Sequence, residues 1–263
     1  EESDLMNQLD LFVESHLNLQ VKISYFDHHA FVVRHGLTEC LRVLDVGTGN
    51  GAFAARLAKD HPTIQFVGID KRKSCIDSCQ DLLSKNFSAQ QVDMFAKESE
   101  FNFSQFDGFL MRYFLLHVDN AQKILALFKT KAKRSSKFWI IDLDWSQFEC
   151  VPQHSSFDKM TKLVKDFCSK ISIDTQGGQN VLPMLEANGY QNIKVERIPF
   201  TQQNVPIEEL ALYLKQEMQC YSRMSGRPVN DPDTHEIIKF IDEDFRSGSF
   251  KISYGMILLC AEL

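Results

Sequence analysis

The sequence predicts an α/β protein with a doubly wound, mostly parallel sheet of seven strands, covered by helices on both faces. Three observations predict this fold. Short apolar strands alternate with helical segments between residues 41 and 188, glycines follow the first strand directly, and a long apolar strand ends the chain. Repeated strand–helix alternation is typical of parallel sheets, because each parallel pair of strands needs a crossover connection.

The predicted strands are short, largely apolar runs. They lie at 41–46, 64–69, 90–92, 106–111, 138–143, 193–198 and 251–261. Helical segments are expected between them, at 52–59, 74–83, 120–133, 156–171 and 179–188. Two further helices, 3–19 and 21–36, are expected before the first strand.

The last two predicted strands would form a simple hairpin if helices at 206–223 and 234–246 did not separate them. This arrangement predicts one antiparallel strand. Long insertions between neighbouring strands usually carry function. We therefore expect the insertion at about 201–249, together with an N-terminal helical cap (1–37), to form a lid over the carboxyl edge of the sheet in the main domain (38–263).

Composition narrows the class of protein. The formal net charge of -6 argues against a nucleic-acid partner, since phosphate contacts need dense lysine and arginine. No apolar run reaches membrane-spanning length. The seven cysteines are scattered without a Cys-x-x-Cys pair, which predicts reduced thiols, a cytoplasmic location and no metal site. The sequence leaves a homodimer open.

Residues 43–51 carry the strongest chemical signal, with the sequence Val-Leu-Asp-Val-Gly-Thr-Gly-Asn-Gly. Glycines after a strand permit a tight turn and the close approach of a ligand, and the helix that follows offers unpaired N–H groups. Asp70 ends the second strand, 23 residues after Gly47. A carboxylate at this place can accept both hydroxyls of a ribose.

Residues 47–52 also match the dinucleotide pattern G-x-G-x-x-G/A, so an NAD(P)-dependent oxidoreductase is an alternative. Asp45 weighs against it, because a carboxylate two residues before the first glycine would repel a pyrophosphate. The same carboxylate suits a cofactor with an ammonium and a sulfonium group. Electrostatics therefore favours S-adenosylmethionine.

The loop resembles the signature of class I S-adenosylmethionine-dependent methyltransferases, which have a Rossmann-like fold. Gly68-Ile69-Asp70, Val92-Asp93-Met94, 106–112, 115–118 and Asn188-Gly189-Tyr190 resemble further segments of that family in order and spacing. The resemblance covers about 40–200 and the final strand, and implies that residues 38–263 form the methyltransferase domain. It implies cofactor contacts at Asp45, Gly47, Thr48, Gly49, Asp70, Lys71, Asp93, Met94 and Arg112.

The sequence departs from the family at two places. Lys133-Arg134-Ser135-Ser136-Lys137 replaces the usual Pro-Gly-Gly turn before the fifth strand, and no Asn/Asp-Pro-Pro-Tyr follows the fourth. The second departure argues against methylation of nucleobases or glutamine amides. The resemblance is then to the branch that methylates small molecules, such as quinone-biosynthesis and natural-product enzymes, by in-line transfer. A non-catalytic, methyltransferase-like scaffold is a further alternative.

The acceptor side has five candidate residues and no obvious base. They are Arg112, Tyr113, His117, Asp144 and Trp145. Arg112 and Tyr113 follow the fourth strand, where an ion pair and a packed ring are the structural alternatives. His117 could act as a base or only bond to a helix start. Asp142 and Asp144 alternate at the end of the fifth strand, so either could take a proton or bind an acceptor amine.

Overall fold

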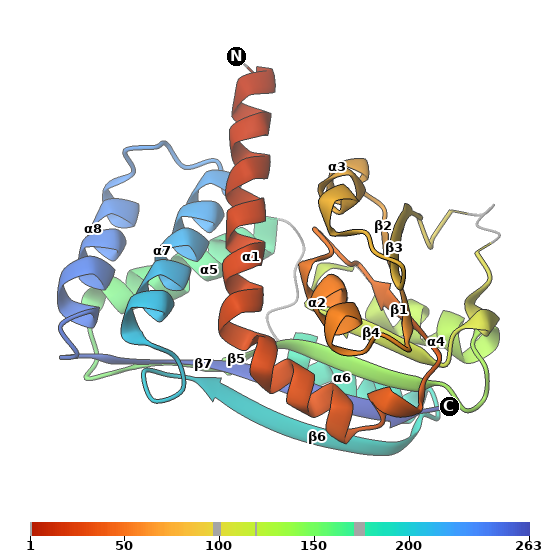
Figure 1. Cartoon of the computed structure of the whole chain (residues 1–263). Helices are drawn as coiled ribbons and strands as arrows, with labels where there is room; N and C mark the ends of the chain where they lie inside the picture. Colours follow the sequence, from red (N-terminus) through yellow and green to blue (C-terminus); the bar gives the residue numbers. More distant parts are fainter. Residues whose placement is uncertain (1, 97–100, 119, 171–176) are drawn as a thin grey trace. The chain divides into compact units, whose positions relative to one another are not determined.

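The computed structural model of the protein describes residues 2–96, 101–118, 120–170 and 177–263 (Figure 1). The chain forms two compact units. Unit 1 comprises Glu1–Ile23, Asp144–Gln176 and Ile198–Met256, and unit 2 comprises Ser24–Leu143, Gly177–Arg197 and Ile257–Leu263. The division predicted from the sequence, a cap at 1–37 and a domain at 38–263, stays a prediction.

One seven-stranded sheet has the strand order β3-β2-β1-β4-β5-β7-β6. Strand β7 runs antiparallel to both of its neighbours and the other pairs are parallel. The doubly wound fold with one antiparallel strand is therefore confirmed. The strands are β1 (Arg42–Val46), β2 (Gln65–Asp70), β3 (Phe87–Gln91), β4 (Gly108–Arg112), β5 (Lys137–Val151), β6 (Gln191–Phe200) and β7 (Lys251–Glu262).

Strand β1 lies between β2 and β4, with Asp45 opposite Gly68 on one side and Leu110 on the other. These central strands are buried along almost their whole length, which is why they appear in the sequence as continuous apolar runs. Because they are parallel, the loops that follow β1, β2 and β4 leave the sheet at the same edge. All the candidate cofactor residues lie on or directly after strands at this edge.

The predicted helices are present, with shifted ends. The bounds are α1 (Glu2–Arg34), α2 (Ala52–Asp60), α3 (Lys73–Ser78), α4 (Ala121–Lys131), α5 (Ser155–Lys170), α6 (Gly177–Ala187), α7 (Ile207–Met224) and α8 (Pro232–Phe240). Short 3-10 turns lie at Leu37–Glu39, Gln80–Leu82, Phe103–Gln105 and Leu115–His117, and a π-helical turn follows α8 at Ile241–Phe245.

Helix α1 corrects one prediction, because it is a single helix where the sequence suggested two. Its 33 residues contain no proline and no glycine, so nothing in the backbone ends the helix near residue 20. It ends just before Gly36, which has a φ of 90°. Strand β5 is also longer than predicted, at 15 residues, because polar residues continue it past the apolar run.

The core of unit 2 is rich in phenylalanine. Phe109 stacks on Phe138 with ring centroids 4.8 Å apart. The Phe128 ring centroid lies 4.9 Å from that of Phe109, and the Tyr190 centroid lies 5.0 Å from that of Phe138. The Tyr190 hydroxyl donates to the Leu125 carbonyl at 2.9 Å, so this buried polar group is satisfied. The aromatic cluster joins α4, through Phe128, and the turn after α6, through Tyr190, to strands β4 and β5.

In unit 1, α5, α7 and α8 pack against one another. A buried hydrogen bond of 2.8 Å between Ser222 and Thr234 joins α7 to α8. Arg227 pairs with Asp166 of α5 at 2.8 Å. No helix in the described part of the chain is long and apolar enough to cross a membrane.

Candidate active site

The loop after β1 is built from three glycines in the left-handed region. The φ angles are 69° for Gly47, 57° for Gly49 and 73° for Gly51. A Cβ at Gly47 would lie 2.4 Å from the Phe114 ring, and one at Gly51 would lie 2.8 Å from the Cys79 sulfur. The conformation and the close packing therefore both require glycine here. Helix α2 begins at Ala52, directly after the loop.

Thr48 fixes the loop to the two central strands. Its amide donates to the Ile69 carbonyl at 2.9 Å, and its hydroxyl donates to Asp45 at 2.6 Å. A Cβ at Gly68 would lie 2.7 Å from the Thr48 hydroxyl oxygen. The absence of a side chain at Gly68 therefore leaves room for Thr48 against β2.

Asp45 is a buried acid at the end of β1, only 4% exposed. Burial raises the pKa of Asp45 to about 6, against the opposing effects of the Thr48 hydrogen bond and of the Arg112 charge. The neighbouring Asp70 carboxylate raises it further. A cation bound beside Asp45 would remove this penalty, as the ammonium group of a cofactor can.

Asp70 connects the end of β2 to the glycine loop. One carboxylate oxygen accepts the Gly49 amide at 3.2 Å, and the other accepts the Arg72 amide at 2.9 Å. The Arg72 Nε lies 3.5 Å from this second oxygen. The side chain is 7% exposed, so Asp70 is held in place as a buried acceptor beside the loop.

Three further predicted cofactor residues lie next to β2 and β3. Asp93 is exposed and accepts the Phe95 amide at 2.9 Å, as a turn-capping aspartate does. Met94 packs on the core of unit 2. Lys71 is exposed, and its carbonyl accepts from Gln91 at 3.0 Å. None of these contacts tests whether the three residues bind the cofactor, so their cofactor roles stay predictions.

Arg112 ends β4 and Tyr113 follows it, both within an aromatic cluster. The Arg112 guanidinium lies 4.9 Å from the Phe53 ring centroid and 5.1 Å from that of Tyr113. Tyr113 has a φ of 51°, a strained value for a residue with a side chain, and its amide donates to Ile141 at 2.7 Å. Such strain is often found at functional sites.

Sequence reasoning missed Phe53 and two further residues near the site, His28 and Phe114. His28, fully buried on α1, lies with its ring centroid 5.9 Å from Phe53 and 6.1 Å from Tyr113. Burial, and then the Arg112 charge, lower the pKa of His28 well below its ordinary value. Phe114 packs on Gly47. No sequence pattern connects α1, α2 and the segment after β4, so only the folded chain reveals these contacts.

The remaining acceptor-side candidates have defined local partners. His117 has exposed surface, yet burial of its ring, and then the charges of Arg72 and Lys71, lower its pKa to about 4, against the opposing effect of Asp70. Asp142 is fully buried and accepts the Leu116 and Leu143 amides at 3.2 Å and 2.8 Å. Burial raises the pKa of Asp142 to about 7. Asp142 thereby holds the segment after β4.

Asp144 and Trp145 lie in unit 1. Asp144 is 2% exposed and accepts from the Ser146 amide and hydroxyl at 3.2 Å and 2.5 Å. Trp145 is half-buried and contacts the Tyr254 ring at 5.3 Å. The described residues hold no cluster of three metal-ligating side chains.

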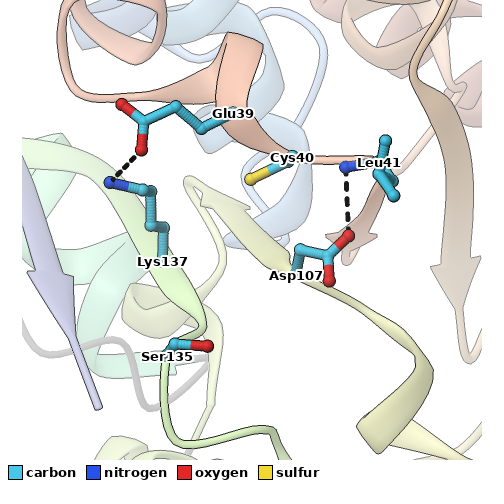
Figure 2. A pocket seen from close by; sticks show the side chains of 6 residues that line it. All are labelled: Glu39, Cys40, Leu41, Asp107, Ser135 and Lys137. Atoms are coloured by element: carbon cyan, nitrogen blue, oxygen red, sulfur yellow. Dashed lines mark hydrogen bonds and ion pairs between the residues drawn. The ribbon is translucent and has the colours of Figure 1, made fainter.

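A pocket of about 240 Å³ lies at the other ends of the strands, before β1, β4 and β5 (Figure 2). Lys137 pairs there with Glu39 and Glu262, each at 3.2 Å, and Asp107 pairs with Lys133 at 2.7 Å. Asp107 also accepts the Leu41 amide at 3.0 Å. Since its charged groups are paired and it lies away from the glycine loop, this pocket is separate from the candidate site.

A doubly wound sheet with a glycine loop after β1 and an acid at the end of β2 defines an α/β protein that binds a nucleoside cofactor. Residues 37–189, more than half of the chain, match the family described as a methyltransferase domain. The chain belongs to this family. The family uses S-adenosylmethionine, and the two buried acids and the glycine loop have the chemistry that this cofactor needs. This supports the methyltransferase interpretation over the oxidoreductase alternative.

Solved structures share the fold at low identity. A Haemonchus contortus phosphoethanolamine N-methyltransferase 2, in complex with phosphomonomethylethanolamine and S-adenosylhomocysteine, has a TM-score of 0.59 and 15% identity over 90% of this chain and 53% of that one. The chain thus spans about half of that protein. A putative sarcosine dimethylglycine methyltransferase from Galdieria sulphuraria has a TM-score of 0.58 and 12% identity, with 91% and 86% covered.

A third structure, a SAM-dependent methyltransferase from Archaeoglobus fulgidus, has a TM-score of 0.52 and 16% identity, with 94% of this chain and 99% of that one covered. No curated protein matches the sequence. At these identities, the structural likeness establishes the fold.

Asp45 makes cofactor affinity depend on pH. Since its pKa is raised to about 6, acidification protonates the carboxyl that should pair with the cofactor ammonium. We expect the dissociation constant of S-adenosylhomocysteine to rise by about tenfold between about pH 8 and pH 5. Calorimetric titration across this range measures it. Asp45→Asn should bind weakly at every pH, and a wild-type affinity independent of pH would contradict the ammonium role of Asp45.

Proposed function

We propose that the protein transfers the methyl group of S-adenosylmethionine to a small-molecule acceptor by in-line displacement. The observation that carries the proposal is the glycine loop with its two buried acids. Asp45 lies at the start of this loop, and Asp70 accepts the amide of Gly49 within it. When bound, the cofactor supplies a methyl group activated by a positive sulfur.

The roles proposed for the loop follow from charge and hydrogen-bonding capacity. Asp45 would bind the ammonium group, and Asp70 would accept the ribose hydroxyls. Gly47, Thr48 and Gly49 would present their backbone to the amino-acid part. Asp93 and Met94 would contact the adenine, with Lys71 beside the ribose, as the family resemblance implies.

On the acceptor side, we propose Arg112 and Tyr113 as the residues that shape the pocket. The strained backbone of Tyr113 and the aromatic rings around Arg112 support this assignment. His117 has a lowered pKa, so its ring is neutral at neutral pH and is a weak base. In-line transfer needs no dedicated base. Alignment of the acceptor with the methyl group, together with the exclusion of water, lowers the activation barrier by roughly several kcal/mol.

Two observations support a small acceptor. From the last residue of β4 the sequence reads Arg112-Tyr113-Phe114-Leu115, without the Asn/Asp-Pro-Pro-Tyr motif. Two structural neighbours are described as acting on, or binding, small amines. We further propose a cytoplasmic location, supported by seven free cysteines, and an acceptor-selecting lid role for the insertion at about 201–249.

A methyl-transfer assay tests the proposal. The protein is incubated with S-adenosylmethionine labelled at the methyl carbon and with pooled small metabolites, total RNA or a protein lysate in separate reactions. We expect S-adenosylhomocysteine to form with small metabolites only, and Asp45→Asn to be inactive. Label found only in RNA or protein would contradict the small acceptor. Thermal stabilisation by NAD rather than by S-adenosylhomocysteine would contradict the cofactor.

A further inference from the structure

A buried acid in unit 1 has no role in the site described above. Glu217 lies in the middle of α7 and is 2% exposed. Its Oε1 accepts three hydroxyl hydrogen bonds, from Tyr213 at 3.2 Å, Tyr221 at 2.7 Å and Tyr254 at 2.9 Å. Tyr213 and Tyr221 stand one helical turn before and after Glu217, and Tyr254 comes from β7. The three tyrosines thus fix the carboxyl group in one orientation.

The second oxygen, Oε2, is buried and has no hydrogen-bond partner among the residues that the structure describes. Leaving a buried acceptor without a donor costs about 1–3 kcal/mol, and more for a charged group. Natural proteins keep few such atoms, and those that persist often meet a water, an ion or a ligand. The unpartnered oxygen therefore points to a missing donor.

The surroundings of Glu217 supply no counter-charge. In the described part of the chain, Glu217 forms no ion pair with lysine, arginine or histidine. The ring of His16 stacks on Tyr213 with a centroid distance of 5.0 Å, but burial lowers the pKa of His16 to about 4. His16 is therefore neutral at pH 7. Burial raises the pKa of Glu217 to about 7, against the opposing effect of the three hydroxyls.

The tyrosines that donate to Glu217 are part of a larger aromatic cluster. Tyr213 and Tyr254 have ring centroids 5.9 Å apart, and Trp145 and Phe148 contact Tyr254 at 5.3 Å and 5.7 Å. Aromatic faces attract cations, and they do so more strongly where water is excluded. An unpartnered carboxylate oxygen among aromatic rings fits a protonated amine, which brings both a positive charge and N–H donors.

We propose that Glu217, with Tyr213, Tyr221 and Tyr254, binds the protonated amine group of a small molecule within unit 1. The ligand class is a small, amine-bearing molecule, and this site goes beyond the proposed methyltransferase function. Glu217 is a binding residue in this proposal.

Direct binding tests the site without turnover. The probes are benzylamine and ethanolamine hydrochlorides, each compared with a neutral alcohol of similar shape, benzyl alcohol and ethylene glycol. We expect calorimetry to detect binding of at least one amine and of neither alcohol. Glu217→Gln should weaken amine binding by about tenfold or more. The proposal would be overturned if neither amine binds, or if amine and alcohol bind alike. It would also be overturned if potassium chloride, at the same ionic strength, raises the thermal stability of the protein as much as the amines do.

The matched control is Glu209→Gln, which neutralises another acid of α7. Glu209 pairs with Lys22 at the surface, at 2.6 Å, so its replacement should leave amine binding unchanged. Equal weakening by both variants would overturn the role of Glu217. Circular dichroism checks that each variant is folded.

Proton release gives a second measurement, on the wild-type protein alone. With a pKa of about 7, Glu217 is partly protonated at pH 7, and a bound ammonium favours its ionised form. Amine binding should therefore release a fraction of a proton, seen as different heats in phosphate and Tris buffers. Amine binding at pH 7 without proton release would overturn the proposal, even if Glu217→Gln fails to fold.

Titration with S-adenosylhomocysteine on the same preparations separates the two proposals. If the cofactor product binds and the amines do not, the inference about Glu217 fails and the methyltransferase function stands. If the amines bind and the cofactor product does not, the methyltransferase function fails and the inference about Glu217 stands.

Discussion

Replacing Asp70 with alanine should weaken the binding of S-adenosylhomocysteine by about a hundredfold or more while the protein stays folded. Each charge-assisted hydrogen bond from a ribose hydroxyl is worth roughly 1.5–3 kcal/mol, and the alanine variant loses two. It also loses the bonds from the Gly49 and Arg72 amides, so the glycine loop is held less firmly. Calorimetric titration measures the affinity, and a cooperative thermal transition shows that the fold persists.

Asp77→Ala is the control for this experiment. Asp77 is an exposed acid on α3 that pairs with Lys73 at 2.6 Å, close in the sequence to Asp70 but without a contact to the loop. We expect the Asp77→Ala variant to bind S-adenosylhomocysteine with the affinity of the wild type. An unchanged affinity in Asp70→Ala would mean that the ribose is bound elsewhere.

Gly47→Ala should abolish cofactor binding and destabilise the fold. The left-handed conformation costs a residue with a side chain about 1–2 kcal/mol. At Gly47, with a φ of 69°, the added Cβ would also lie 2.4 Å from the Phe114 ring. The ring or the loop must therefore move. Urea unfolding gives the loss of stability, and thermal shift with S-adenosylhomocysteine gives the loss of binding.

Gly248 offers a matched control for Gly47. It has a similar φ of 80°, and a Cβ there would meet no atom within 4 Å. Gly248→Ala should lower the free energy of unfolding by about 1 kcal/mol and leave cofactor binding intact. The double variant Gly47→Ala with Phe114→Ala should recover part of the stability. If the two glycine variants behave alike, the packing of Phe114 on the loop has no effect beyond the backbone strain.

The sequence predicts best what is encoded locally. The buried strands β1, β2 and β4 are continuous apolar runs, and the glycine loop and Asp70 lie within a short stretch of chain. Strand β5 exceeds its apolar run, because its second half is polar and its extent is set by pairing rather than by hydrophobicity. The sequence predicts two helices where α1 is one, because apolar spacing alone does not show whether a helix continues.

Contacts between distant segments lie beyond such reasoning. Tyr213, Glu217 and Tyr221 are spaced four residues apart, so a helical wheel places them on one face. Tyr254 joins them from a strand 37 residues after Glu217, and no pattern predicts that contact. Phe114 likewise meets Gly47 only in the folded chain. The sequence could therefore indicate the cofactor loop, but not the acid among the tyrosines.

Thr48 and Gly68 fill one volume between them. A methyl group at residue 68 would lie 2.7–2.9 Å from three atoms of the threonine side chain, so residue 68 can grow only if residue 48 shrinks. Homologous sequences should accordingly covary at these two positions, with alanine at 68 accompanied by glycine or alanine at 48. Because Thr48 also donates to Asp45, a relative with the smaller pair must supply another donor to that acid. Covariation at residues 48 and 68 should thus extend to the hydrogen-bond donors around Asp45, the proposed partner of the cofactor's ammonium group.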